Sequence, residues 1–187
     1  MKDSLQHESP HWALLDQLGA HRPAPVDDTT LAGCSSPPCQ QTHTDPAYHG
    51  FLADADVVAR LNVLLEAERA GALVCAQTLK QLPAGELHDL LLRIQHDEVK
   101  SCRGLLRSIH LLNGTPSTAI GDFHPKAMAI ADLAERLHLL DRGQAWVVRQ
   151  LDALLPQVMQ PEVFAQLQTM RDDHRDNIEK LRHESPR

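Results

Sequence analysis

Two carboxylates and an imidazole, the side-chain types that bind metal ions, occupy positions where helical proteins normally place apolar residues: Glu68, Glu98 and His174. Each lies in a segment whose apolar residues recur at intervals of three and four, and each falls on the apolar face of its segment. Glu66 lies off that face and is expected to meet water. Burying an unpaired carboxylate costs on the order of several kcal/mol, so a core that holds two of them normally supplies a cation, a proton or a hydrogen-bond donor. The sequence therefore predicts a metal site inside a bundle of helices.

Further residues are candidates for the same site. Gln144 lies on the apolar face of its segment, and Asp141 lies at the flank of that face. Cys102 follows Glu98 by four residues, so its thiol would face the same interior, either as a small hydrophobic group or as a soft ligand or redox thiol. Each of these polar residues also has a plain structural interpretation, as a hydrogen-bonded group in a core without metal.

The elements that would position these residues are helices. Aromatic residues make up only 3% of the chain, and the recurring apolar residues are Leu, Ala, Val and Ile, a composition that favours an all-α fold. The apolar period predicts helices over about residues 54–82, 86–112, 125–155 and 161–181. Pro83 ends the first helix and Asn113-Gly114 stops the second, while Pro125 and Pro161 suit the first turns of the third and fourth.

The connections between these helices predict their topology. Short links join the first helix to the second and the third to the fourth, so each pair should be antiparallel. Between the second and third helices, residues 113–124 could extend over about 40 Å, which is about the length of a helix of 27 residues. We expect an antiparallel four-helix bundle with one long crossover between helices 2 and 3, the connectivity of ferritin-like folds.

Short stretches of the chain resemble a known superfamily. LNVLLEAERAG at residues 61–71 and HRDNI at 174–178 are similar to helices of a ferritin-like domain, and LNGTPS at 112–117 resembles the crossover of a bacterial branch of that superfamily. The resemblance covers about residues 54–182. It implies a ferritin-like bundle.

The same resemblance implies roles for the site residues. In the di-iron members, two helices each give one Glu, and the other two each give Glu-x-x-His. Glu68 matches a single Glu, Glu98 matches the first residue of one Glu-x-x-His, and His174 matches the last residue of the other. The chain departs from the pattern at the remaining ligand positions. Ser101 stands where the first His would be, Arg171 where the second Glu would be, and Gln144 or Asp141 where the single Glu of the third helix would be.

This incomplete ligand set disfavours a di-iron centre, because two carboxylates alone do not balance two cations. A single iron, manganese or zinc ion held by Glu68, Glu98 and His174 is the expected cofactor. The alternative is a metal-free scaffold or interaction module without catalytic activity. Such a module would pair as a homodimer through an exposed apolar strip at Trp146-Val147-Val148, and a homodimer is the expected oligomer.

Residues 1–53 differ from the rest of the chain in composition. Six prolines among Ser, Thr, Asp and His rule out a long helix there, so we expect a flexible arm with one short helix near residues 11–18. The helical domain should then span residues 54–183. The arm also contains a two-Cys, two-His set: Cys34, Cys39, His43 and His49. Its spacing matches no zinc module well, so an excess of polar residues is the plainer interpretation.

The net charge and the hydropathy of the chain argue against two classes of partner, nucleic acids and membranes. A net charge of −7 without a basic cluster argues against nucleic-acid binding, and no apolar stretch is long enough to cross a membrane. The N-terminus lacks the apolar region of a secretory signal, so we expect a cytoplasmic protein whose cysteines, Cys75 among them, are thiols. No nucleophile motif, phosphate-binding loop or zinc-protease motif is present, so the sequence leaves open whether the protein is an enzyme.

Overall fold

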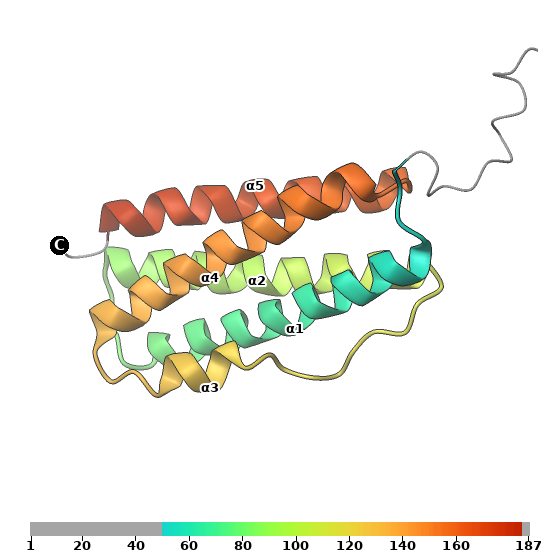
Figure 1. Ribbon diagram of the computed structural model, residues 1–187. Helices are drawn as coiled ribbons and strands as arrows, with labels where there is room; N and C mark the ends of the chain where they lie inside the picture. Colours follow the sequence, from blue (N-terminus) through green and yellow to red (C-terminus); the bar gives the residue numbers. More distant parts are fainter. Residues whose placement is uncertain (1–49, 185–187) are drawn as a thin grey trace, which may run out of the picture. The chain divides into compact units, whose positions relative to one another are not determined.

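Every element of secondary structure within residues 50–184, the part of the chain that this computed structural model describes, is a helix. The elements are α1 (Asp54–Leu79), α2 (Glu86–Leu111), α3 (Phe123–Met128), α4 (Leu133–Leu154), the 3-10 turn η5 (Leu155–Gln157) and α5 (Pro161–Glu184) (Figure 1). The predicted all-α class is confirmed. The expected helix near residues 11–18 and the two-Cys, two-His set lie outside the described residues.

The four long helices lie side by side (Figure 1). Helix α1 contacts α2 and α4, and α5 contacts the same two helices. Among these described helices, the backbones of α1 and α5 are not adjacent, and neither are those of α2 and α4, so the four form a ring and the diagonal pairs meet only through side chains in a shared core. None of the helices in residues 50–184 is both long enough and apolar enough to span a membrane.

The core consists of two apolar layers. The first apolar layer lies where α1 and α5 begin and α2 and α4 end; its fully buried members include Leu61, Leu65, Leu105, Ile109, Leu151 and Leu167. The second apolar layer lies towards the opposite ends of the same helices and contains Cys75, Leu90, Leu91, Ile94, Leu137, Leu140 and Leu181. The antiparallel order of the helices brings the two layers into register, and the space between them is left for polar groups.

Helix α2 ends at the predicted stop. Asn113 has a φ of 54°, and its N–H donates to the carbonyl of His110 at 3.0 Å, while Gly114 N–H donates to Ile109 O at 2.8 Å. These two bonds form a Schellman motif. A Cβ at Gly114 would lie 2.6 Å from the side chain of Val58 on α1, so glycine is needed where the chain leaves α2.

The crossover that follows α2 is fastened to α1 by polar side chains. Asn62 Oδ1 accepts a hydrogen bond from Ser117 N at 2.7 Å, and Glu66 accepts one from the Ser117 hydroxyl at 2.5 Å. Arg69 donates to the carbonyls of Ser117 and Ala119 at 2.5 and 3.1 Å. Glu66 is therefore half-buried against the crossover and meets water only in part.

The helix predicted over residues 125–155 is in fact two helices, α3 and α4, separated by a four-residue link. Asp132 caps α4, since its side chain accepts from the Glu135 N–H at 2.8 Å. The buried Arg136 guanidinium donates to Ile130 O at 2.7 and 3.1 Å and holds the link in place. These bonds favour a break that the apolar period alone does not reveal.

The apolar strip expected at Trp146-Val147-Val148 is not exposed. Val147 is buried in the first apolar layer, Trp146 packs against that layer, and Val148 is half-buried. Helix α4 contacts α1, α3 and α5, so little of its apolar surface reaches solvent. The homodimer expected from this strip stays a prediction.

The helical body begins slightly before the predicted boundary at residue 54. Leu52 packs against the first apolar layer, and its N–H donates to Gln157 O at 2.9 Å. Helix α1 ends at Leu79 instead of residue 82, because the next hydrogen bonds join residues three apart instead of four. Gln81 N–H donates to Thr78 O, and Leu82 N–H donates to Leu79 O.

Candidate metal centre

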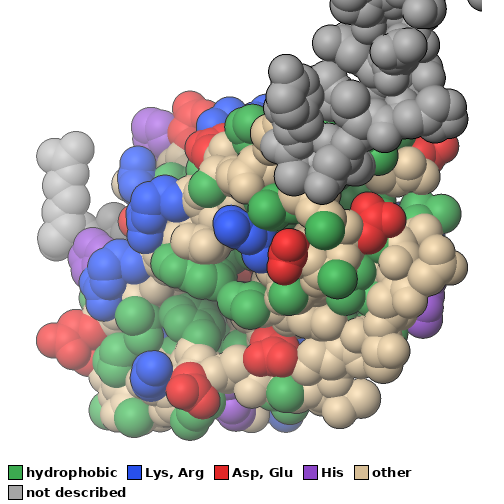
Figure 2. Space-filling view, turned by 45° about the vertical axis from the view of Figure 1, so that its right-hand side comes forward, with side chains coloured by type: hydrophobic (Ala, Val, Ile, Leu, Met, Phe, Trp, Pro, Cys, Tyr) green, Lys and Arg blue, Asp and Glu red, His purple; other side chains and the backbone are tan. Residues whose placement is uncertain are grey.

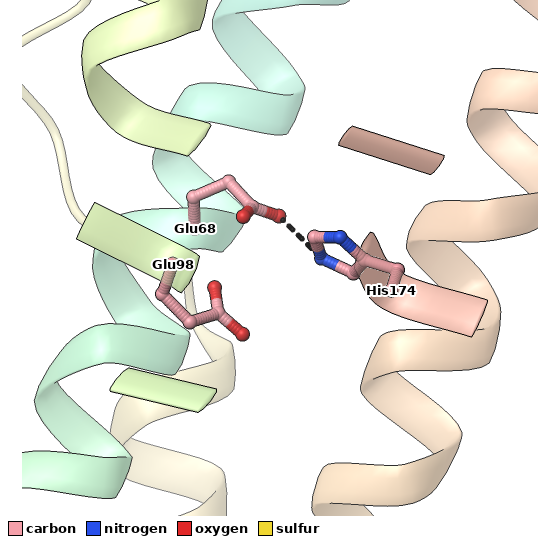
Figure 3. A group of neighbouring side chains, drawn as sticks. All are labelled: Glu68, Glu98 and His174. Atoms are coloured by element: carbon pink, nitrogen blue, oxygen red, sulfur yellow. Dashed lines mark ion pairs between the residues drawn. The ribbon is translucent and has the colours of Figure 1, made fainter. Parts of the chain in front are cut away.

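Glu68 on α1, Glu98 on α2 and His174 on α5 point into the space between their helices (Figure 3). Their exposed fractions are 1%, 3% and 1%, so all three are removed from solvent. One ligand atom from each lies within 4.8 Å of the other two. The three side chains that the sequence singled out therefore converge at one point.

These residues belong to a polar layer to which every long helix contributes one side chain. The layer separates the first apolar layer from the second, and its fourth member is Gln144 on α4, which is 3% exposed. Along the chain, Glu68 lies between Leu65 and Cys75, Glu98 between Ile94 and Leu105, Gln144 between Leu140 and Val147, and His174 between Met170 and Leu181.

The backbone of α5 orients the His174 ring. Its Nδ1 lies 2.9 Å from Met170 O, and because a carbonyl only accepts, Nδ1 carries the proton of this bond. In a neutral ring the lone pair is then on Nε2, which lies 3.2 Å from Glu68 Oε1. Histidines that bind metals are commonly held in this way, with the second ring nitrogen donating to a carbonyl or carboxylate.

The Glu68 carboxylate lacks the partners that a buried charge requires. Neither of its oxygens, nor His174 Nε2, has a hydrogen-bond partner within the described part of the chain, although Glu68 and His174 are within ion-pair distance. No Lys or Arg among residues 50–184 forms an ion pair with Glu68 or Glu98. Two buried acids facing one imidazole leave an excess of negative charge.

The charges in the cluster shift the protonation equilibria of its members. Burial raises the pKa of Glu98 well above its usual range, and the Glu68 carboxylate raises it further, while a hydrogen bond from Gln144 opposes both. Burial lowers the pKa of His174, but the Glu68 carboxylate, the Met170 carbonyl and Asp173 together outweigh this effect, so the net pKa is raised. Without a cation, the site therefore holds protons more tightly than free side chains do.

Gln144 and Gly71 determine the position of the Glu98 carboxylate. Gln144 Nε2 donates a short hydrogen bond to Glu98 Oε1. On the opposite side, a Cβ at Gly71 would lie 2.7 Å from Glu98 Oε2 and 2.8 Å from Cδ and Oε1. The absence of a side chain at Gly71 therefore makes room for the carboxylate inside the core.

A cavity of about 490 Å³ leads from the surface to this cluster. Glu68, Gly71, Glu98 and Gln144 are among the residues that line it. Figure 2 shows hydrophobic side chains gathered around a hollow on one face of the molecule, with charged side chains around them. Three members of the polar layer therefore lie at the inner end of this cavity.

The remaining sequence candidates do not join the cluster. Asp141 forms an ion pair with Arg182 at 3.3 Å, away from the three grouped ligands. Arg171, at a position where the di-iron pattern has Glu, pairs with Asp152 and Asp172 at 3.6 and 3.0 Å. Each of these side chains has a partner of opposite charge outside the cluster.

Neither cysteine of the described residues is placed as a ligand. Cys102 packs against the first apolar layer, and burial followed by the charges of Glu68 and Glu98 raises its pKa to about 12. Burial and the same two acids also raise the pKa of Cys75 well above its usual range. Both are free thiols, and neither belongs to the group of three candidate ligands. The packing of Cys102 agrees with the small hydrophobic role given to it above, and its alternative role as a soft ligand or redox thiol stays a prediction.

The pattern of apolar residues did not identify Gly71 or the carbonyl of Met170. A glycine in the interior of a helix three residues after a buried Glu signals a close approach of another group, and Gly71 could have been noticed on that ground. The Met170 carbonyl carries no signal in the sequence beyond its place four residues before His174. Ser101, where the di-iron pattern has His, is buried, and its hydroxyl has no hydrogen-bond partner among the described residues.

One comparison with known proteins identifies a family for the helical part of the chain. Searches of curated proteins and of solved structures each found no match. A family model described as "Domain of unknown function (DUF6306)" matches residues 55–183, which include all four helices of the polar layer. Because this match covers more than half of the sequence, the chain belongs to the DUF6306 family.

Proposed function

We propose that this protein is a ferritin-like four-helix bundle that binds one divalent transition-metal ion through Glu68, Glu98 and His174. The observation that carries the proposal is the pair of Glu68 carboxylate oxygens, which are buried, have no hydrogen-bond partner among the described residues, and lie beside His174 Nε2, with one oxygen 3.2 Å from it. Buried charges are normally paired or bind metals. A cation at this point would satisfy all three side chains together.

Charge balance favours a divalent ion. Two carboxylates and a neutral imidazole carry a charge of about −2, which one divalent ion neutralises. A di-iron pair would leave a positive excess, in agreement with the loss of the other carboxylate ligands at Arg171 and Gln144. Oxygen and imidazole ligands suit iron, manganese and zinc.

The spacing of the ligand atoms agrees with a single ion. Bonds of about 2.0–2.2 Å to oxygen and nitrogen keep the ligands of one ion no more than about 4.4 Å apart. The candidate atoms lie within 4.8 Å of one another, so small side-chain rotations would close the site. Three protein ligands leave further coordination positions for water or a ligand from the cavity, as in catalytic metal sites.

The ferritin-like arrangement is supported by connectivity. The pairs α1–α2 and α4–α5 are each joined by a short link, and the two pairs are tied by a long connection that contains α3. That connection runs along α1 (Figure 1). One long crossover between two helical hairpins distinguishes ferritin-like bundles from simple up-and-down bundles.

Metal titration of the metal-free protein tests the proposal. We expect one Mn²⁺, Zn²⁺ or, under anaerobic conditions, Fe²⁺ per chain after desalting, measured by mass spectrometry of the metal. Glu68→Gln, Glu98→Gln and His174→Gln should each weaken binding by more than about 100-fold, since loss of outer-shell partners alone costs about 10- to 100-fold.

Two variants serve as matched controls. Asp141→Asn removes a half-buried acid that pairs with Arg182, and Cys102→Ser removes the thiol nearest in sequence to Glu98. Both should bind the ion as the natural protein does. If the natural protein takes up none of the three ions, or if the three ligand variants bind them equally well, the polar layer is a metal-free core and the metal proposal fails.

A further inference from the structure

The walls of the cavity above the polar layer are apolar. Val63 and Ala67 on α1, Phe123 on α3, and Leu139 and Trp146 on α4 line it. At about 490 Å³ its volume lies within the range of about 300–1,000 Å³ of small-molecule sites. These walls favour the hydrophobic part of a ligand.

The rim of the cavity carries cations without partners. Arg142 and Arg149, both exposed, line it from α4, and neither forms an ion pair or a side-chain hydrogen bond with any residue of 50–184. Seven residues apart, they lie about 10 Å from each other along one face of the helix. Lys126 adds a third positive charge, which is 3.9 Å from Asp122. An anionic group at the rim would find two free guanidinium groups.

The floor of the cavity also has an unused acceptor. Gln144 lines the cavity and is 3% exposed, and its Oε1 has no hydrogen-bond partner among the described residues, because its amide nitrogen is the group that contacts Glu98. A buried acceptor without a donor costs free energy, so a water at the floor that donates to it would be stabilised.

We propose that this cavity binds a small organic monocarboxylate with an apolar body. Its carboxylate pairs with Arg142 or Arg149 at the rim, and its apolar part lies between α1 and α4 above Glu68 and Glu98. The inference rests in part on the proposed function, because a metal ion at the floor neutralises the two acids that would otherwise repel an anion. The ligand would then reach the open side of the metal centre.

Isothermal titration of the full-length, metal-loaded protein with octanoate tests this inference. We expect one octanoate per chain, and a dissociation constant that rises about tenfold in the double variant Arg142→Gln/Arg149→Gln, which removes the charge-assisted contacts. Ala67→Leu, which places a larger side chain in the wall, should also weaken binding. Octylammonium, with the same chain and the opposite charge, should bind much more weakly than octanoate.

The matched control is Arg93→Gln/Arg103→Gln, which removes two exposed cations of α2 that do not line this cavity and leaves octanoate binding unchanged. Metal content is measured in every sample, so the two proposals fail separately. Metal-loaded protein that does not bind octanoate, or that binds it equally with and without Arg142 and Arg149, overturns the inference alone. Protein that takes up none of the three ions, yet binds octanoate through these arginines, overturns only the metal proposal.

Discussion

Each ligand of the proposed centre depends on a neighbour that the pattern of apolar residues does not identify. The pattern predicted that Glu68, Glu98 and His174 face the core, because their spacing from Leu and Ile fixes the face of the helix on which they lie. The Met170 carbonyl that orients His174 and the space above Gly71 that admits Glu98 arise only when the helices pack. It was thus predictable which candidate residues face the core, and their orientation there was not.

Gly71→Ala should weaken metal binding without unfolding the protein. The new Cβ would lie within 2.8 Å of the Glu98 carboxylate, so the flexible end of Glu98 must move while the helix backbone stays. Alanine also favours a helix by about 1 kcal/mol over glycine. We expect the affinity for Mn²⁺ or Zn²⁺ to fall about 10- to 100-fold, as for other disturbances around a metal site, with the far-ultraviolet circular dichroism unchanged.

A variant that binds metal normally would mean that the carboxylate of Glu98 is not held where Gly71 places it. A variant that loses its helical signal would mean that the clash is relieved by moving α1 against α2. Gly85→Ala is not a suitable control, because Gly85 has a φ of 159° and caps α2. Gly143→Ala is the control, because Gly143 is also a helical glycine and its added Cβ would lie 3.1 Å from the Phe123 ring.

At the scale of the elements, α1 has two functional faces. One face carries the apolar residues and Glu68, and the other carries Asn62, Glu66 and Arg69 at intervals of four and three residues. This second set holds the crossover, which leads to Phe123 and Lys126 in the wall of the cavity. The sequence predicted the length of the crossover, but a polar stripe on a helix normally indicates solvent, so its attachment to α1 was missed.

The break between α3 and α4 shows a similar limit. The run Asp132-Leu133-Ala134-Glu135 has the spacing of a capping box, which indicates the start of a helix at this point. The apolar period instead predicted one long helix through it. The buried Arg136 that bridges Ile130 O and Gln81 Oε1 could not be predicted, because its two partners come together only in the packed structure. Apolar spacing therefore predicts which helices form, and long-range polar contacts decide where they are interrupted.

Arg69→Met should loosen the crossover and leave the helices intact. Methionine keeps the length of the side chain but removes the donors to Ser117 O and Ala119 O, so we expect a loss of about 1–2 kcal/mol in the free energy of unfolding. Hydrogen exchange should become faster in residues 115–128 and stay unchanged in α5. Arg60→Met, an exposed arginine of the same helix without contacts to the crossover, is the control. Equal exchange in both variants would contradict the role assigned to Arg69.

At the scale of the whole molecule, two apolar layers stabilise the packed helices, and the buried charges of the polar layer between them lower that stability. The second layer would be continuous with the first if Glu68, Glu98, Gln144 and His174 were apolar. A buried ionic group is often less stabilising than an apolar one of the same size. The polar layer is therefore better explained by a ligand than by stability.

The stability of the metal-free protein should fall as the pH rises. The folded-state pKa of Glu98 is raised above its ordinary value of 4.5, so the folded state holds this proton more tightly than the unfolded state. The resulting stabilisation is complete below pH 4.5 and is lost as the pH rises through the raised pKa. His174, whose pKa is raised above 6.5, acts in the same direction: its contribution is present below 6.5 and is lost as the pH rises further.

Thermal unfolding between pH 5.5 and 8, with and without Zn²⁺ or Mn²⁺, measures this effect. Without metal, the melting temperature of the natural protein should decrease across the range, and Glu98→Gln, which keeps an acceptor for Gln144 but carries no charge, should melt higher at pH 8. With metal, the order reverses, because the ion competes with protons and stabilises the natural protein more as the pH rises. If Glu98→Gln instead melts lower than the natural protein at pH 8 without metal, the Glu98 charge is already compensated within the fold, and the core has no need of a cation.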